Sequence, residues 1–343
     1  MKKTKRILHL LPSNSFSGAE NVVCTIIQNN SKYEMFYCSP KGPIEQVLKE
    51  KNIKYIPLDK FNNKNIKKII ENYKIDIIHA HDFKASFQAA MTGFKGKIIS
   101  HLHNNPPFIK TWNIYTIIYN IISKKFHKVA VVSQAVYEES IFKKSIKNKY
   151  VIINNVVNKK QIISLSKEQF NQKYDVAFIG RITDQKDPLL FIKIINILKK
   201  NNEKIKAVMI GSGDLESECI KLINEYNLSE NIKMIGFISN PYKILKNCTV
   251  VLMPSKYEGF GLTAIESMCL KKPLLNSGKG GLKTIFKNNK EFICHIEKEY
   301  AELTNSLLSN RQKYDTYKKE CEEIIKPYIQ IDKWMDNIYS LYE

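Results

Sequence analysis

Arginine is nearly absent from this chain of 343 residues. It has 54 Lys and Arg residues, and Arg6, Arg181 and Arg311 are its only arginines. No window approaches the roughly 18 apolar residues that a membrane-spanning helix needs. The seven cysteines show no metal-ligand spacing, which favours reduced residues of a cytosolic protein over a zinc or disulfide framework. Short repeats and low-complexity tails are also missing, and these absences together indicate an ordinary globular protein.

The N-terminus superficially resembles a secretory signal, because four basic residues precede an apolar run. That run, residues 7–11, contains His9 and stops at Pro12. It is therefore shorter than the roughly 7–15 apolar residues of a signal peptide. We expect it to form a first strand instead.

The formal net charge of +21 is unevenly distributed. Residues 1–172 hold 28 Lys and Arg against 11 Asp and Glu, a net of +17, whereas residues 173–343 hold 26 against 22, a net of +4. A basic half attracts nucleic acid, anionic membrane or anionic substrate. Alternatively, the lysines reflect a genome biased toward Lys, Asn and Ile, and they serve only to keep the protein surface solvated. No nucleic-acid-binding module is recognisable, so we expect no nucleic-acid partner.

Short apolar runs alternate with amphipathic stretches along the whole chain, and a polar interval at 158–173 divides them into two rounds. Strands are predicted at 6–11, 34–38, 54–57, 76–79, 97–101, 128–132 and 150–153, then at 175–179, 205–210, 232–237, 249–253 and 273–276. Helices are predicted between them, among others at 19–29, 43–50, 66–73, 134–142, 188–200 and 215–226. Such alternation implies parallel sheets covered on both faces. We predict an α/β fold of two doubly wound, Rossmann-like domains facing a cleft, residues 1–157 and 158–327, with residues 328–343 crossing back as a helix onto the first.

Ten of the thirteen glycines fall at or just after predicted strand ends, where open α/β sheets bind their ligands. The most informative stretch is 254–266, Pro-Ser-Lys-Tyr-Glu-Gly-Phe-Gly-Leu-Thr-Ala-Ile-Glu. An apolar strand runs into it, two glycines allow a tight turn, and a helix begins near Leu262. The N–H groups at such a helix start form an anion site. Glu258 and Glu266 could accept hydrogen bonds from hydroxyls, so the stretch indicates a nucleotide-sugar site.

Arg181 follows the first strand of the second round, in Gly-Arg-Ile-Thr-Asp-Gln-Lys at 180–186. In a chain that otherwise uses lysine, an arginine at a strand-to-helix turn indicates that a fork-shaped donor is needed, as for a diphosphate. Lys186 would add a point charge. An incidental surface arginine is the alternative.

With these motifs in place, the sequence resembles retaining glycosyltransferases of the GT-B fold, family 4, of the cell-surface polysaccharide type. The resemblance covers essentially the whole chain. It rests on Glu258-x7-Glu266, on Gly-Arg-(x)4-Lys at 180–186, on Gly-Ser-Gly at 211–213 and on Phe-Ser-Gly-Ala-Glu at 16–20. In the last stretch Ser17 stands where the family more often has the first glycine of a Gly-Gly pair. The stretch after Pro273 matches the usual sequence of the family less closely.

The resemblance implies a role for each matching residue. Arg181 and Lys186 would hold the diphosphate and stabilise its developing charge, and Glu266 would bind the ribose hydroxyls. Glu258 and the N–H groups of the following turn would hold the donor sugar and phosphate. The full predicted donor site is Gly18, Gly180, Arg181, Lys186, Gly211, Gly213, Phe237, Glu258, Gly259, Phe260, Gly261, Leu262, Thr263 and Glu266. His103, Arg181, Lys186 and Glu258 are the predicted catalytic residues.

Four histidines follow adjacent strands of the first round: His79, His81, His101 and His103. His103 matches the family's active-site histidine, with His101 as a near alternative. The resemblance also implies retention of anomeric configuration, without a protein nucleophile. No Asp-x-Asp sequence is present, so we expect neither a metal nor another cofactor. A hydrolase using the two glutamates, a soluble acceptor and a non-catalytic partner subunit are the alternatives.

A nearly apolar helix is predicted at 112–122, with Ile114, Ile117, Ile118, Ile121 and Ile122 on one stripe that packs on the sheet. Its aromatic residues and the lysines at 124, 125 and 128 could enter an anionic bilayer. We therefore expect a peripheral protein on the cytoplasmic face of the inner membrane, with a lipid-linked saccharide as acceptor. In the last helix, Trp334, Ile338 and Tyr342 are spaced to bury one face.

Overall fold

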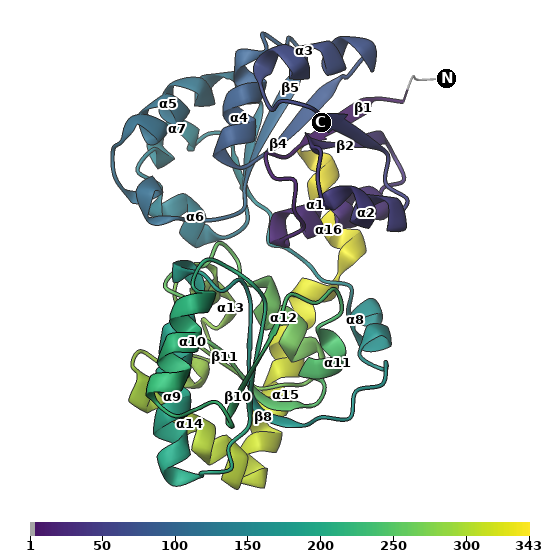
Figure 1. Cartoon of the computed structure of the whole chain (residues 1–343). Helices are drawn as coiled ribbons and strands as arrows, with labels where there is room; N and C mark the ends of the chain where they lie inside the picture. The colour runs from purple at the N-terminus through teal and green to yellow at the C-terminus, as the bar shows by residue number, and fades with distance from the viewer. Residues whose placement is uncertain (1–3) are drawn as a thin grey trace. The chain divides into compact units, whose positions relative to one another are not determined.

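The structure, a computed structural model, describes residues 4–343. They divide into two compact units. The N-terminal unit runs to Val156 and includes Gln330–Glu343, and the C-terminal unit is Val157–Ile329. Each unit contains one parallel sheet with helices on both faces, which confirms the predicted fold class (Figure 1). Among the described residues, no helix combines the length and the apolar character required to cross a membrane.

The N-terminal unit has a seven-stranded sheet in the order β3-β2-β1-β4-β5-β6-β7. Its strands are β1 (Arg6–Leu10), β2 (Glu34–Pro40), β3 (Tyr55–Leu58), β4 (Ile77–His81), β5 (Lys97–Leu102), β6 (Lys128–Val131) and β7 (Tyr150–Ile152). Its helices are α1 (Gly18–Gln28), α2 (Ile44–Glu50), α3 (Asn63–Asn72), α4 (Asp82–Met91), α5 (Ile114–Ile122), α6 (Gln134–Glu139), α7 (Lys143–Ile146) and α16 (Ile331–Ser340), with 3-10 helices η1 (Pro107–Lys110) and η2 (Ser123–Lys125).

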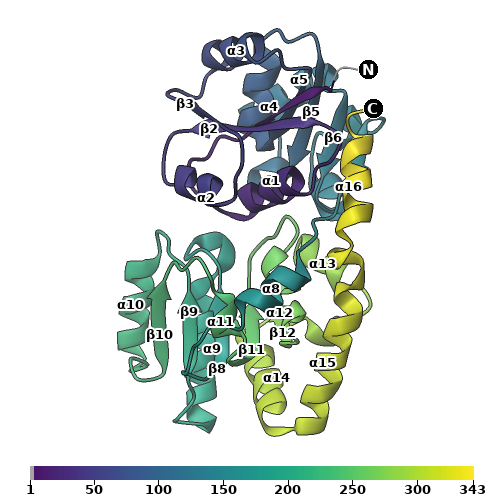
Figure 2. The ribbon, with the colours of Figure 1, turned by 90° about the vertical axis from the view of Figure 1, so that its right-hand side faces the viewer.

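The C-terminal unit has a five-stranded sheet in the order β10-β9-β8-β11-β12, which can be followed from edge to edge in Figure 2. Its strands are β8 (Tyr174–Ile179), β9 (Ala207–Ile210), β10 (Ile232–Gly236), β11 (Cys248–Met253) and β12 (Leu274–Asn276). Its helices are α8 (Lys159–Leu165), α9 (Pro188–Asn201), α10 (Glu216–Glu225), α11 (Tyr242–Leu245), α12 (Leu262–Cys269), α13 (Gly281–Ile285), α14 (Glu297–Ser309) and α15 (Arg311–Ile325), with η3 (Asp184–Lys186), η4 (Lys290–Phe292) and η5 (Lys326–Ile329). Helices α9, α10 and α14 cover one face of the sheet, and α8, α11, α12 and α15 the other (Figure 1).

The central strands are buried along most of their length because helices cover both faces of each sheet. In β1, for example, Ile7 to Leu10 are fully buried, and in β8 Val176 to Phe178 are at most 2% exposed. All seven cysteines lie in these cores. The same burial explains why continuous apolar runs marked the strands in the sequence.

The last helix packs onto the N-terminal unit through the predicted residues. Trp334, Ile338 and Tyr342 are at most 4% exposed. The Tyr342 hydroxyl contacts His79 Nδ1 at 2.8 Å, and the Ser31 N–H donates to the Tyr339 hydroxyl at 2.9 Å. The chain end therefore contributes to the core beside β4.

Two predictions about helices were wrong. The helix predicted at 134–142 ends at Glu139, and the chain resumes helical structure only at Lys143. In α5 most of the isoleucine stripe does not pack on the sheet, because Ile114, Ile117 and Ile121 are 63%, 44% and 61% exposed, and among its five residues Ile122 alone is buried. The buried face instead carries Thr116, Tyr119 and Ile122, and the Tyr119 hydroxyl forms a hydrogen bond with the Ser100 hydroxyl at 2.7 Å.

Candidate functional site

The turn after β8 carries the two predicted cations of the donor site. Arg181 is exposed, and its Nη2 donates to Gln185 Oε1 at 3.0 Å. Lys186 ends η3, and Asp187 follows in the left-handed conformation with φ 51°. The Asp187 carboxylate accepts from the N–H of Leu190 at 3.2 Å and caps α9, which begins with Pro188. The local sequence therefore ends the turn at Lys186 and fixes its position.

Lys186 and Glu258 form a buried ion pair that joins the turns after β8 and β11. The Lys186 Nζ lies 2.5 Å from Glu258 Oε1, and the two side chains are only 14% and 6% exposed. A pair removed from water to this degree is costly unless each charge keeps its partner. The pair places a cation and a carboxylate together at the sheet edge where the sequence predicted a sugar-diphosphate.

Gln185 connects the same two turns, and the sequence analysis did not identify it. Its side-chain Nε2 donates to the backbone carbonyl of Tyr257 at 3.1 Å, and its backbone carbonyl accepts from the backbone N–H of Lys256 at 2.8 Å. The side chain is 7% exposed and also accepts from Arg181. Gln185 thus orients Arg181. Its only signal in the sequence was its place between Arg181 and Lys186.

The glycines at 211 and 213 bring the turn after β9 against the turn after β8. A Cβ at Gly211 would lie 1.9 Å from the Gly180 carbonyl oxygen, and one at Gly213 would lie 2.3 Å from that of Ile182. The N–H of Ile182 donates to Ser212 O at 2.9 Å, which closes the contact. These glycines therefore support the backbone on either side of Arg181, whatever else they contact.

The turn before α12 has the predicted form. Gly261 has φ 108°, a conformation that favours glycine, and Leu262 starts the helix. The Glu258 carbonyl accepts from the Gly281 N–H at 2.8 Å, and a Cβ at Gly281 would lie 2.4 Å from Phe260 Cα. These contacts hold the turn in place, and N–H groups that open a helix have no partner within it, so this end of α12 is suited to an anion.

Glu266 lies one turn into α12 and is half-buried. The Tyr242 hydroxyl donates to Glu266 Oε1 at 3.1 Å. Burial raises the pKa of Glu266, whereas the Tyr242 hydrogen bond and the charge of Lys186 act in the opposite direction. The carboxylate retains acceptor capacity for further hydroxyls. Tyr242 was not identified from the sequence, because a tyrosine on a short helix carries no motif.

The remaining predicted donor residues differ in their setting. Thr263 follows Leu262 in the first turn of α12, and Phe237 lies directly after β10 and is 65% exposed. Gly18 is exposed at the start of α1, where Ser17 is extended and its hydroxyl donates to Glu20. The contacts of these residues with a donor stay a prediction.

The N-terminal unit gathers five histidines, His9, His79, His81, His101 and His103, on or directly after β1, β4 and β5; we refer to them as the histidine layer. His9 lies opposite His79 in the sheet, and His81 opposite His101. Because alternate residues of a strand share a face, all five side chains lie on one face of the sheet. His9 was read only as part of the first strand in the sequence, and the register of β1 with β4 adds it to the layer.

Hydrogen bonds connect the histidine layer in two chains. His9 Nδ1 and His81 Nε2 are 3.1 Å apart, and His81 Nδ1 and His103 Nε2 are 2.8 Å apart. The second chain runs from the Tyr342 hydroxyl through His79 to His101, with His79 Nε2 3.1 Å from His101 Nδ1. Burial lowers the pKa of His9 and His103 to about 3 and also lowers those of the other three. The layer is therefore neutral at pH 7.

His103 is the member of the layer with the most access to solvent, since it is half-buried and His101 is fully buried. The backbone N–H of His103 donates to Asp82 Oδ1 at 2.7 Å. Asp82 itself has φ 64°, and burial raises its pKa to about 7. Between the two alternatives, the structure leaves His103 rather than His101 accessible, and its contact with a donor stays a prediction.

Comparisons with known proteins identify the family of the chain and its fold. The profile of Glycosyl transferases group 1 matches residues 159–324, and that of Glycosyltransferase Family 4 matches residues 19–161. A solved structure of HepE from Anabaena, in complex with UDP and glucose, superposes with a TM-score of 0.85 at 17% identity and covers 98% of each chain. That likeness shows the GT-B fold.

Three relatives illustrate the range of the family. An uncharacterized glycosyltransferase of Methanocaldococcus jannaschii, MJ1059, is 29% identical over 62% of this chain and 58% of its own length, so the chain spans less than two thirds of that relative. The capsular polysaccharide biosynthesis glycosyltransferase CapH of Staphylococcus aureus is 23% identical over 90% of this chain and 92% of its own. An N-acetylgalactosaminyltransferase of Campylobacter jejuni, named for an N-acetylgalactosamine-N,N'-diacetylbacillosaminyl-diphospho-undecaprenol substrate, is 26% identical over 82% of each chain. With the two profiles together spanning residues 19–324 and the fold confirmed, the chain belongs to the GT-B glycosyltransferases of group 1.

Proposed function

We propose that this protein is a retaining glycosyltransferase that moves a hexose or N-acetylhexosamine from a nucleotide-sugar, with UDP as the expected nucleotide, to a lipid-linked saccharide. The product would belong to a surface polysaccharide such as a capsule, exopolysaccharide, O-antigen or teichoic acid. One observation carries the proposal: the buried Lys186–Glu258 pair lies beside exposed Arg181. This arrangement supplies cations for a diphosphate and an acceptor for sugar hydroxyls at one sheet edge.

The chemistry follows from where charge develops. The bond between the anomeric carbon and the diphosphate oxygen breaks, and its electron pair leaves with the nucleoside diphosphate. The acceptor hydroxyl forms the new bond on the same face of the sugar and transfers its proton to a departing phosphate oxygen. Lys186, Arg181 and the N–H groups that start α12 would stabilise the phosphate charge, and such preorganised electrostatics are usually the largest catalytic term. These groups supply the positive charge without a metal, so we propose transfer that requires none.

Glu258 and Glu266 are assigned to recognition of the donor. Glu258 is held by Lys186 and would accept from sugar hydroxyls, and Glu266 would accept from the ribose hydroxyls. A glycosidase would need its two carboxyl groups to flank one glycosidic bond. Here one carboxylate is paired with a lysine and the other with Tyr242, which favours transfer over hydrolysis.

Relatives support the choice of acceptor. CapH is named for capsular polysaccharide, and the Campylobacter jejuni relative for a diphospho-undecaprenol-linked saccharide. A third relative, from Staphylococcus aureus, is a poly(ribitol-phosphate) α-N-acetylglucosaminyltransferase. HepE was solved with UDP and glucose. These names motivate a UDP-sugar donor and a polymer or lipid-linked acceptor for this chain.

Exposed side chains on and before α5 support peripheral docking to an anionic membrane. Trp112, Ile114, Tyr115 and Ile121 are 56%, 63%, 66% and 61% exposed. Lys124, exposed, and Lys128 follow them in the half of the chain that has a net charge of +17. Apolar residues beside basic ones suit the boundary of an anionic leaflet, where each lysine contributes about 1 kcal/mol. We therefore place the protein on the cytoplasmic face of the inner membrane.

Two measurements test the proposal separately for donor and membrane. UDP should raise the melting temperature of the wild type, and it should raise that of Arg181→Ala much less. Arg311→Ala is the control, because it changes an exposed arginine elsewhere, and its melting temperature should rise as in the wild type. Equal shifts in both variants would remove Arg181 from the donor site.

The membrane test uses vesicles that contain anionic lipid. At low salt they should sediment the wild-type protein, and they should sediment the double variant Trp112→Ala/Tyr115→Ala to a smaller extent. Ile220→Ala, at a 52% exposed position on α10, is the control and should sediment as the wild type does. A double variant that sediments normally would reject the docking surface and leave the donor site untouched.

A further inference from the structure

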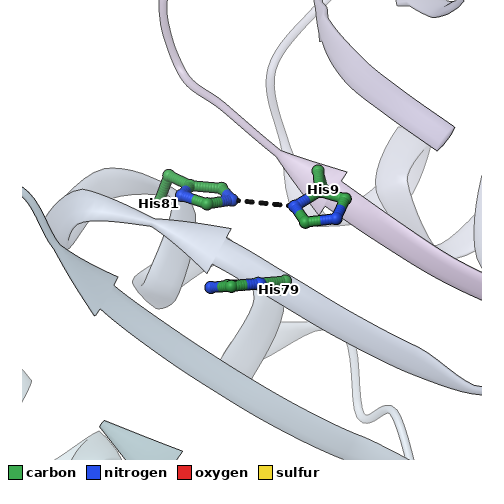
Figure 3. A group of neighbouring side chains, drawn as sticks. All are labelled: His9, His79 and His81. Carbon is green, nitrogen blue, oxygen red and sulfur yellow. Dashed lines mark hydrogen bonds between the residues drawn. The ribbon is translucent and has the colours of Figure 1, made fainter. Parts of the chain in front are cut away.

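We propose that His9, His79 and His81 form a binding site for one late first-row divalent metal ion, with Zn²⁺ as the expected occupant. The site belongs to the N-terminal unit and is independent of the glycosyl transfer proposed above. The three imidazoles are shown in Figure 3, where the His9 and His81 rings meet nitrogen to nitrogen and His79 lies beside both.

The strands bring the three histidines together. His9 of β1 lies opposite His79 of β4, and His81 follows two residues later on the same face. One ring nitrogen from each lies within 4.8 Å of the others. The ring centroid of His9 is 5.0 Å from that of His79 and 5.4 Å from that of His81. The three ring nitrogens are therefore close enough for one ion to bind all of them after small side-chain rotations.

The spacing of one nitrogen pair already fits a tetrahedral ion. A Zn–N distance of 2.0–2.1 Å and tetrahedral angles place two ligand nitrogens about 3.3 Å apart. His9 Nδ1 and His81 Nε2 are 3.1 Å apart, so an ion could replace their shared proton with a shift of a few tenths of an ångström. Three histidines with an open fourth position are an established zinc ligand set.

Two of the three outer contacts also fit a ligand set. A metal-bound histidine usually has its second ring nitrogen fixed by another group, which orients the ring. His79 Nδ1 is held by the Tyr342 hydroxyl at 2.8 Å, and His81 Nδ1 by His103 at 2.8 Å. His9 Nε2 is buried without a hydrogen-bond partner, although most buried polar atoms have one. The hydrogen bonds within the histidine layer therefore leave at least one buried ring nitrogen without a partner.

The chemistry of the site selects the kind of ion. Neutral imidazole binds Zn²⁺, Cu²⁺ and Ni²⁺ well, whereas Ca²⁺ and Mg²⁺ prefer oxygen ligands that this trio does not offer. His9 and His79 are fully buried and His81 is 1% exposed, so the ion would enter as the domain folds. His81 also belongs to a second close trio, with His101 and His103. We assign the ion to the first trio because it is the deeper one, and half-buried His103 remains open to solvent.

Metal content of the full-length protein tests the assignment directly. Protein made without a polyhistidine tag, refolded in the presence of Zn²⁺ because the site is buried, and then dialysed against metal-free buffer, should retain about one ion per chain. His9→Gln should lose the ion, while His103→Gln should keep it, because His103 is no ligand in the first trio and a glutamine amide can keep the hydrogen bond to His81 Nδ1. His127→Gln and His295→Gln are matched controls at the two exposed histidines outside the layer and should keep it as well.

A second measurement keeps the test decisive if His9→Gln does not fold. Cobalt-substituted wild type should show the visible absorption of a tetrahedral site, and X-ray absorption should give three imidazole nitrogens. Wild type without a stoichiometric ion, retention by folded His9→Gln, or loss in His103→Gln would each overturn the assignment. None of these readouts depends on transfer activity, so the outcome is separate from that of the proposed function.

Discussion

Replacing Lys186 by methionine removes one charge of the buried pair and keeps most of the apolar stem. In the native protein its Nζ lies 2.5 Å from Glu258 Oε1, and the Glu258 side chain is 6% exposed. The variant leaves that carboxylate buried without its cation. Losing one partner of a buried pair costs about 3–5 kcal/mol. Because Lys186 is 14% exposed and water can reach the vacated position, we expect the lower end, about 3 kcal/mol.

A second variant separates the pair from the rest of the turn. Lys186→Met/Glu258→Gln carries neither charge, so its unfolding free energy should return to within about 1 kcal/mol of the wild type. Lys256→Met is the control, because Lys256 and Asp184 form an ion pair in the same turns with side chains 45% and 74% exposed. A pair so exposed contributes less than about 1 kcal/mol.

Urea unfolding followed by circular dichroism measures all three variants, and steady-state transfer measures their function. Both variants that lack Lys186 should lose about 10²–10³-fold in kcat, because the cation that stabilises the leaving diphosphate is gone. A Lys186→Met protein as stable as the wild type, or a double variant no more stable than the single one, would refute the buried-pair argument. Normal turnover in both would refute the catalytic role of Lys186.

Three further predictions concern the same unit. Because burial raises the pKa of Glu266, its carboxylate takes up a proton at higher pH than an ordinary glutamate, so UDP affinity should fall on acidification and calorimetry on Glu266→Gln should show a weaker pH dependence. Tyr242→Phe removes the hydrogen bond donated to Glu266 and should weaken UDP binding about fivefold, about 1 kcal/mol, with kcat unchanged; equal affinity would exclude Tyr242 as a positioning residue. Gly211→Ala should destabilise the protein by at least about 1–3 kcal/mol, since its Cβ would lie 1.9 Å from the Gly180 carbonyl oxygen at φ 139°, and should also weaken UDP binding. The control Gly236→Ala, at φ 77° with nothing within 4 Å of the Cβ, should be milder in both thermal unfolding and binding.

Much of the fold was accessible from the sequence because its strands are buried on both faces. A strand such as β11 reads as a continuous apolar run, and the glycines that follow its neighbours mark the strand ends. Strand limits moved by one or two residues, for example in β4, which extends to His81 rather than stopping at His79. His81, the polar residue at the end of this extension, is buried and hydrogen-bonded to His9 and His103, which no apolar pattern could indicate.

The candidate site was predictable where a motif carried it. The Glu258–Glu266 stretch and Arg181 with Lys186 do lie on adjacent strand ends, and the structure adds that Lys186 and Glu258 pair directly. Gln185 and Tyr242 were missed because their importance lies in contacts with residues distant in sequence.

Helix α5 shows the opposite error. Its isoleucine spacing satisfied the helical period, but the Tyr119–Ser100 hydrogen bond and the burial of Thr116 turn a different face inward. A helix that is apolar nearly all round does not define its buried face by periodicity alone.

The central claim is that the C-terminal unit binds a nucleotide-sugar for retaining transfer. The most direct measurement is nuclear magnetic resonance of the product formed from an α-linked UDP-hexose or UDP-N-acetylhexosamine and a lipid-linked saccharide, with a chelator present. We expect UDP release coupled to an α-linked product, abolished in Lys186→Met. A β-linked product, or release of UDP and free sugar without transfer, would contradict the account.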